Sequence, residues 1–154
     1  MKNLFIAALA LIFIAGACKT SGNVAQSANV GSQADDIVEK YWKLVELNGS
    51  PVVFDDSLNR NAFLILKAED NRVNANGGCN TLSGTYELDR ATMRIRFSQM
   101  ISTMIACLDM EVEEGLKRAF EMADNYAVSP DGKFLSLNRA RMAPLARFEL
   151  DYLR

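Results

Sequence analysis

The chain has 154 residues, with 19 acidic and 17 basic side chains, a formal charge of -2 and no histidine. This charge gives no general basic field and argues against a nucleic acid partner. We interpret the one basic cluster, Arg139, Arg141 and Arg147, as the solvated outer faces of two strands. Without histidine, neither a Ser-His-Asp nor a Cys-His arrangement can form. Zinc is disfavoured because the chain has no Cys-x-x-Cys pair, and we predict no metal and no cofactor.

An apolar run from Leu4 to Ala15 opens the chain after one lysine. At about 12 residues it is too short to cross a bilayer as a helix, which takes roughly 20, and it has the shape of a secretory signal. We predict a signal peptide over residues 1–17 and lipidation of Cys18, because Ile14 to Cys18 looks like a lipobox. Ala15 replaces the usual leucine, so the alternative is a plain secreted protein with an unpaired Cys18.

Residues 18–36 are rich in Ser, Gly, Asn, Gln and Ala and contain no aromatic residue. Such a segment cannot bury enough apolar area to offset the entropy lost on ordering. We therefore predict a lipid-anchored flexible tether with a root-mean-square length of about 20–25 Å. In similar bacterial lipoproteins an aspartate after the cysteine favours the inner membrane. Because Lys19 follows here, we expect an outer-membrane anchor and a domain that faces the periplasm, with cell-surface exposure as the alternative.

Residues 37–154 have the size of one domain with one core. Short segments of alternating apolar residues recur between turn signals. We predict a mainly β (α+β) domain, with an antiparallel barrel-like sheet of about eight strands and one amphipathic helix packed at its end. The expected strands are Tyr41–Leu47, Ala62–Leu66, Arg72–Ala75, Leu82–Leu88, Met93–Phe97, Tyr126–Val128, Phe134–Leu137 and Ala146–Leu150. The aromatic residues expected in the core are Trp42, Phe63, Tyr86, Phe97, Phe120 and Phe148.

The segment from Met110 to Asp124 has apolar residues at spacings of three and four, which predicts an amphipathic helix. Asp109 is placed to cap its start, and carboxylates in the first turn are favourable near the positive end of the helix dipole. These carboxylates are Glu111, Glu113 and Glu114. Together with Asp109 they could supply the paired carboxylates of a glycoside hydrolase, but capping and the helix dipole already explain their positions. Gly115 costs about 1 kcal/mol relative to alanine, which indicates close contact with a strand.

Two cysteines remain for the folded domain, Cys79 and Cys107. In an oxidising compartment we predict a disulfide that ties the loop before the 82–88 strand to the entrance of the helix. A bridge over about 28 residues stabilises a fold by roughly 3–4 kcal/mol. Two buried free thiols are the alternative. A catalytic thiol would lack a histidine as its base.

The segment from Gly78 to Tyr86 reads GCNTLSGTY, and it is followed by Met100, by Ser102 to Met104 and by Ala106 to Glu111. This combination resembles the META domain family of HslJ-like bacterial envelope proteins, over the range from about Trp42 to Phe148. The resemblance implies an association with heat and envelope stress.

The loop from Asn74 to Asn80 contains two consecutive glycines, which would permit a backbone nest for an anion. We interpret it instead as a tight turn, in which asparagine side chains bond their own backbone and glycine takes positive φ. The resemblance makes this loop the family signature. Possible binding-loop residues are therefore Asn76, Asn80 and Ser83, with Ser102, Thr103 and Met104 from the facing segment.

We predict a non-enzymatic envelope lipoprotein that acts as an interaction or stress-tolerance module at the outer membrane. The stress element comes from the resemblance alone. One alternative is a carrier that binds a lipid or other small apolar ligand within the barrel. Another is a pilotin-like assembly factor with an apolar groove beside the helix. The expected partners are the membrane, through the lipid anchor, and an envelope protein or a small apolar ligand.

Overall fold

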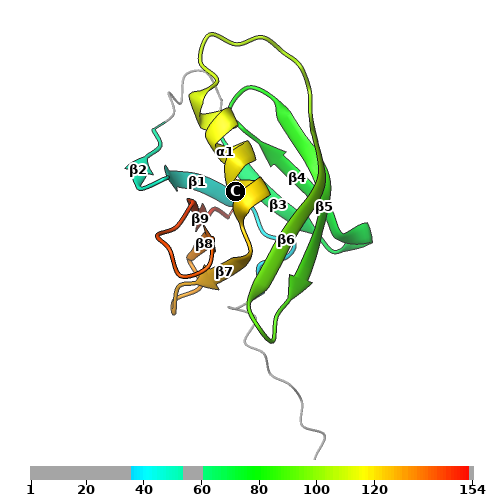
Figure 1. Cartoon of the computed structure of the whole chain (residues 1–154), viewed down its shortest axis with the longest axis vertical. Helices are drawn as coiled ribbons and strands as arrows, with labels where there is room; N and C mark the ends of the chain where they lie inside the picture. Colours follow the sequence, from blue (N-terminus) through cyan, green and yellow to red (C-terminus); the bar gives the residue numbers. More distant parts are fainter. Residues whose placement is uncertain (1–35, 54–60, 153–154) are drawn as a thin grey trace, which may run out of the picture.

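The computed structural model describes residues 36–53 and 61–152 of the chain. The predicted signal peptide, Cys18 and all of the predicted tether except Asp36 lie outside the described residues. No helix in the described part of the chain is both long and apolar enough to cross a membrane. The described part is a strongly curved sheet with one helix across its open side (Figure 1).

Nine strands form one antiparallel sheet in the order β6-β5-β4-β3-β1-β9-β8-β7, with β2 paired to β1. Their bounds are β1 Trp42–Leu47, β2 Ser50–Pro51, β3 Phe63–Lys67, β4 Arg72–Asn76, β5 Thr81–Asp89, β6 Arg94–Ser102, β7 Asn125–Val128, β8 Phe134–Asn138 and β9 Ala146–Leu150. A 3-10 turn, η2 (Glu69–Asn71), precedes β4. The edge strands β6 and β7 approach each other at the turn just before β6, where the Tyr126 N–H on β7 donates to the Met93 carbonyl at 3.0 Å. The sheet is therefore nearly closed, as the sequence predicted.

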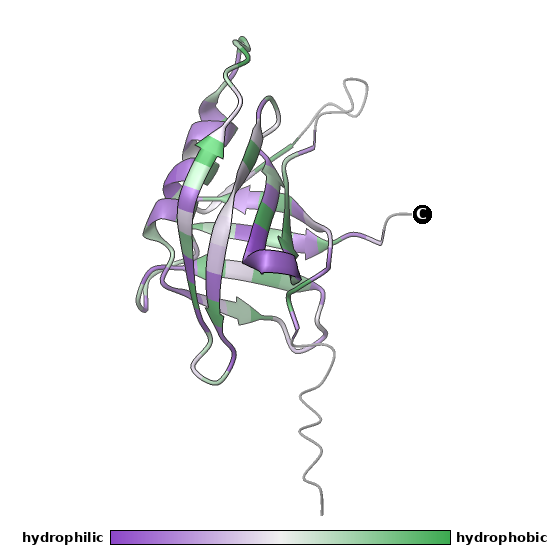
Figure 2. Cartoon of the chain, turned by 90° about the vertical axis from the view of Figure 1, so that its right-hand side faces the viewer, coloured by the Kyte–Doolittle hydropathy of each residue, from purple (hydrophilic) through white to green (hydrophobic). Residues whose placement is uncertain are grey.

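All eight predicted strands are present, and their alternation follows the expected faces except at Phe63 on β3. On β6, for example, Ile95 and Phe97 are buried while Arg94 and Arg96 are exposed. Hydrophilic and hydrophobic residues alternate visibly along the strands (Figure 2). β6 differs from its prediction at both ends: Met93 lies in the preceding turn with φ 55°, and the strand continues to Ser102.

The helix α1 (Glu111–Met122) lies within the predicted range and buries Leu116, Ala119 and Phe120. The Phe120 ring contacts the ring of Phe97 on β6, with 4.7 Å between centroids. Gly115 lies against β1, because a Cβ built on it would collide with Leu47 Cδ2. The close contact expected at this glycine is confirmed. The interior between helix and sheet is filled with side chains such as those of Trp42 and Phe148, both fully buried.

Phe63 is an exception to the predicted core. Its neighbours on β3, Leu64 and Leu66, are the ones buried inside the sheet, so Phe63 points to the outer face. There it stacks on Tyr41, with 4.8 Å between ring centroids and 28° between ring planes. The prediction that Phe63 fills the core was therefore wrong, because alternation along β3 is set by Leu64 and Leu66.

Candidate functional site

The turn between β4 and β5 is stabilised by the side chain of Asn76, the last residue of β4. Asn76 Oδ1 accepts a hydrogen bond from the Gly78 N–H at 2.6 Å. Gly78 has φ 98°, a left-handed conformation that costs glycine little. The Gly77 N–H donates to the Asn80 carbonyl at 3.1 Å. These contacts are those of the tight turn expected from the sequence.

Asn80 is only 2% exposed, and its side chain binds the segment that follows β6. Its Oδ1 accepts hydrogen bonds from Thr103 Oγ1 at 2.7 Å and from the Ile105 N–H at 2.8 Å. Its Nδ2 donates to the Ile105 carbonyl at 3.1 Å. One carboxamide thus satisfies both backbone groups of Ile105 and fixes the path of the chain there.

Glu113, on the first turn of α1, is completely buried. Its Oε2 accepts the Asn80 N–H at 2.8 Å. Its Oε1 lies 2.7 Å from Lys117 Nζ and 3.3 Å from Ser102 Oγ. The start of the helix is therefore bonded to the turn and to the end of β6 through one carboxylate.

The charge on Glu113 is maintained by these partners. Burial alone raises the pKa of a carboxyl group, but the Lys117 ammonium and the Asn80 N–H outweigh burial and hold the pKa of Glu113 below its ordinary value of 4.5. The hydrogen bond to Glu113 likewise raises the pKa of Lys117 above 10.5. At neutral pH the pair is ionised, and Glu113 is a fixed charged anchor for the turn.

Gly77 permits the close approach of helix and turn. A Cβ built on Gly77 would lie 2.5 Å from Glu113 Cγ and 2.9 Å from Glu113 Cα. Since one of these atoms belongs to the helix backbone, a side chain at Gly77 would have to push the helix away.

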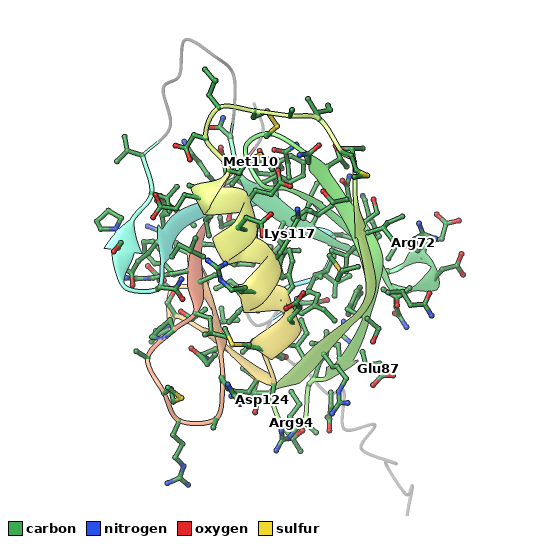
Figure 3. All side chains as sticks on the ribbon, turned by 45° about the horizontal axis from the view of Figure 1, so that its top comes forward. Arg72, Glu87, Arg94, Met110, Lys117 and Asp124 are labelled. Carbon is green, nitrogen blue, oxygen red and sulfur yellow. A yellow bond between two sulfur atoms is a disulfide. The ribbon has the colours of Figure 1, made fainter. Side chains whose placement is uncertain are left out.

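Cys79 and Cys107 form a disulfide with 6.4 Å between their Cα atoms, which confirms the predicted bridge. The bridge lies by the start of α1 near Met110, and Lys117 follows further along the same helix (Figure 3). The helix start also has the expected partner, because Asp109 Oδ1 accepts the Glu111 N–H at 3.0 Å.

Large apolar side chains are exposed at the end of β6 and on the chain between β6 and α1. We define the apolar loop surface as Ile101, Met104, Ile105 and Leu108, all of which are exposed. Met104 is 97% exposed and Leu108 is exposed to the full extent. The apolar surface thus precedes α1, whereas the pilotin-like alternative expected it beside the helix.

The six residues predicted for a binding loop do not form one site, and they have different structural roles. Asn80, Ser102 and Thr103 come together around Glu113 as a bonded cluster. Asn76 shapes the turn, and Met104 points into solvent. Ser83 pairs in register with Ile101 on β6 and makes no side-chain contact with this cluster among the described hydrogen bonds.

Sequence reasoning missed the role of Glu113. From the sequence, Glu113 was explained as a carboxylate stabilised by the helix dipole. Lys117, four residues later, suggests an ordinary ion pair on the helix surface. One signal was available: Glu113, Leu116 and Phe120 share the same helical face. A charged residue in an apolar stripe indicates a buried, bonded carboxylate.

Comparisons with known proteins place this geometry in a family. The META domain model matches residues 35–152. No curated protein matches the sequence at a significant level. Three solved structures share the fold. A protein from Burkholderia xenovorans solved by NMR has 18% sequence identity and a TM-score of 0.60, and the match covers 75% of this chain and 83% of that chain. A second protein solved by NMR has 16% identity and a TM-score of 0.58 (76% of this chain, 93% of that chain), and a DUF4847 family protein from Bacteroides vulgatus has 16% identity and a TM-score of 0.50 (73% of this chain, 93% of that chain). The chain belongs to the META domain family.

Proposed function

We propose that this protein is a non-enzymatic interaction module of the bacterial envelope, which binds the apolar face of a partner protein through the apolar loop surface. The observation that carries this proposal is an exposed apolar loop whose backbone is tied to the turn before β5 at Ile105 and Cys107. Asn80 and the Cys79–Cys107 disulfide restrain it. A loop already ordered in the free protein loses little conformational entropy when it binds. Exposed apolar patches and adaptable methionine side chains are typical of protein-binding surfaces.

Charge favours a protein over a lipid surface as the occupant. Residues 101–110 contain one charged side chain, Asp109, and no lysine or arginine. Segments that lie on bilayers commonly carry basic residues that attract anionic lipids. The apolar loop surface lacks that attraction.

The position of the loop supports the same choice. Asp36, at the beginning of the described chain, forms an ion pair of 3.1 Å with Arg90 in the turn between β5 and β6. The apolar loop surface lies at the other end of these strands (Figure 1). A nine-residue strand such as β5 spans about 30 Å. A domain tethered through its N-terminal side would therefore present this loop away from its anchor.

A photoreactive amino acid at position 104 tests the interaction in cells. We expect Met104, when replaced by this residue, to cross-link to one discrete protein in the envelope. The matched control is Met142, which is 67% exposed on another loop, and there we expect no such product. Absence of a product at position 104, or the same products at both positions, would overturn the proposal.

The lipid anchor is the second part of the proposal: Cys18 carries the lipid and holds the domain at the outer membrane, facing the periplasm. Its support is the lipobox-like sequence that ends at Cys18. We expect Cys18→Ser to move the protein from the membrane fraction to the soluble periplasmic fraction. A serine variant that still fractionates with membranes would rule out the anchor.

A carrier with its ligand inside the sheet has less support. The interior is occupied by Trp42, Phe120 and Phe148, each at most 1% exposed, together with aliphatic residues. A ligand in that position would have to displace packed side chains, which is costly in a close-packed core. A role in stress tolerance rests on the family likeness, and heat sensitivity of a deletion strain would be its test.

A further inference from the structure

A pocket of about 410 Å³ lies on the outer face of the sheet beside the disulfide. This volume falls within the roughly 300–1,000 Å³ of small-molecule sites. Tyr41 and Phe63 supply aromatic surface, Asn61 and Asn76 supply carboxamides, and the Cys79–Cys107 disulfide forms a wall. The proposed protein-interaction function uses none of the first four residues.

The aromatic part of the pocket is a stacked pair. The Tyr41 and Phe63 rings lie on the outer face because Trp42 and Leu64, their neighbours along β1 and β3, fill the interior. Burial raises the pKa of Tyr41, with a smaller contribution from the charge of Asp151, so its phenol is neutral at physiological pH. Together the two stacked rings form an uncharged aromatic surface.

The two carboxamides have hydrogen-bonding groups without a partner among residues 36–53 and 61–152. Asn61 Oδ1 is buried and accepts no hydrogen bond from these residues. An unsatisfied buried acceptor is destabilising, and in native structures it calls for a missing partner. Asn76 Oδ1 is occupied by the Gly78 N–H, whereas no hydrogen bond from the Asn76 amide nitrogen is found among the described residues. The Asn76 amide can thus donate to a ligand, and the Asn61 carboxamide can accept from one once its side chain turns toward the pocket.

Two further observations limit the chemical class of ligand that the pocket can bind. Among the described residues that line the pocket there is no aspartate, glutamate, lysine or arginine, so these residues give a charged ligand no counterion. β3 lies between β4 and β1, so both of its backbone edges are already paired. An extended peptide cannot add there as another strand.

We propose that this pocket binds a neutral sugar ring. The apolar C–H face of the ring packs against the Tyr41–Phe63 pair. The Asn61 side chain turns toward the pocket so that its Oδ1 accepts a hydrogen bond from a sugar hydroxyl or acetamido N–H, and the Asn76 amide donates to a sugar oxygen. A sugar suits this pocket better than a flat aromatic ligand, because it combines an apolar face with hydrogen-bond donors at its edge. This inference goes beyond the proposed protein interaction and does not depend on it.

Two neutral disaccharides serve as probes: N,N′-diacetylchitobiose, which carries acetamido groups, and cellobiose, which does not. Each is titrated to about 10 mM, enough to detect a millimolar Kd, into the full chain in a detergent without sugar. Backbone amide shifts are followed by NMR. We expect saturable shifts at Asn61, Phe63 and Gly78 with at least one probe. No saturable shift at these residues with either probe would overturn the proposal.

Asn61→Ala distinguishes a ligand-binding residue from a structural one. We expect about tenfold weaker sugar binding, since one hydrogen bond is lost. The melting temperature should stay the same or rise, because an unsatisfied buried acceptor has been removed. Asn74→Ala is the matched control, an exposed asparagine on the same face of β4 as Asn76, and it should change neither quantity.

Unchanged sugar affinity in Asn61→Ala, with a lower melting temperature, would make Asn61 a structural residue and overturn the proposal. The two functions fail separately. A cross-link at position 104 without sugar binding would leave the protein interaction standing alone, and sugar binding without a cross-link would leave only the pocket.

Discussion

Among single residues, Glu113 has the largest set of consequences. Its two oxygens bind the Asn80 N–H, Lys117 Nζ and Ser102 Oγ, which belong to three separate parts of the chain. A buried carboxylate is tolerated when its oxygens are bonded and a countercharge is close. Position 113 therefore requires an acceptor, and for full stability it requires a charge.

We expect Glu113→Gln to lower the free energy of unfolding by about 1–3 kcal/mol at neutral pH. The pKa of Glu113 in the folded protein is below 4.5, so the contribution of its charge is present in full above that value. It is lost as pH falls through the folded pKa. The difference between wild type and Glu113→Gln, measured by urea denaturation, should therefore shrink below about pH 4.5.

Glu114→Gln is the control for that experiment, because Glu114 is the neighbouring carboxylate and its side chain is 52% exposed. It should leave stability nearly unchanged over the same pH range. A difference between wild type and Glu113→Gln that does not vary with pH would show that the charge of Glu113 contributes nothing.

At the level of elements, the helix and the turn before β5 meet at Gly77, whereas the helix and β1 meet at Gly115. An added methyl group would encounter different obstacles at these two places. At Gly77 it meets Glu113 Cα at 2.9 Å, and at Gly115 it meets Leu47 Cδ2, the far end of a flexible side chain. The turn should therefore tolerate the methyl group less than the helix does.

Gly77→Ala should cost about 1–3 kcal/mol through overpacking against the helix backbone. Gly115→Ala should cost less, because alanine gains about 1 kcal/mol of helix propensity and Leu47 can move. Thermal unfolding of the two variants makes the comparison. Equal or reversed destabilisation would mean that the helix start can shift freely against the turn.

The strands could be predicted because alternation is a local property of sequence. The elements that escaped prediction depend on distant partners. β2 has two residues and exists through its pairing with β1. The second half of β6 follows a register shift opposite Ser83 and Thr85, and Gln99 has φ 52°, so its alternation is reset there. No local pattern shows such a break, since it is fixed by the neighbouring strand.

At the scale of the molecule, the disulfide joins the sheet to the entrance of the helix. We expect the double variant Cys79→Ser, Cys107→Ser to lose roughly 3–4 kcal/mol, because the bridge restricts the unfolded chain over 28 residues. Urea denaturation under oxidising conditions is the measurement. Cys18→Ser should leave this stability unchanged. If the double variant matched wild type, the bridge would be dispensable for the fold.

The family, the barrel-like sheet, the helix and the disulfide could all be predicted from the sequence. The location of the exposed surfaces could not. Whether Ile105 is buried or exposed depends on the bonds that Asn80 makes across about 25 residues of chain, and Phe63 faces outward only because its strand neighbours point inward. Such choices are made by tertiary packing and not by the pattern of the segment itself.

The carboxamide of Asn80 has a further consequence, for solubility. The segment Met100 to Ala106 is mostly apolar, uncharged and free of proline, and such segments readily stack into intermolecular β-sheets. Free N–H and C=O groups on its backbone would serve as the template for that stacking. Asn80 occupies both groups of Ile105. The protein can therefore display these side chains at its surface while part of the backbone that would nucleate aggregation is already bonded.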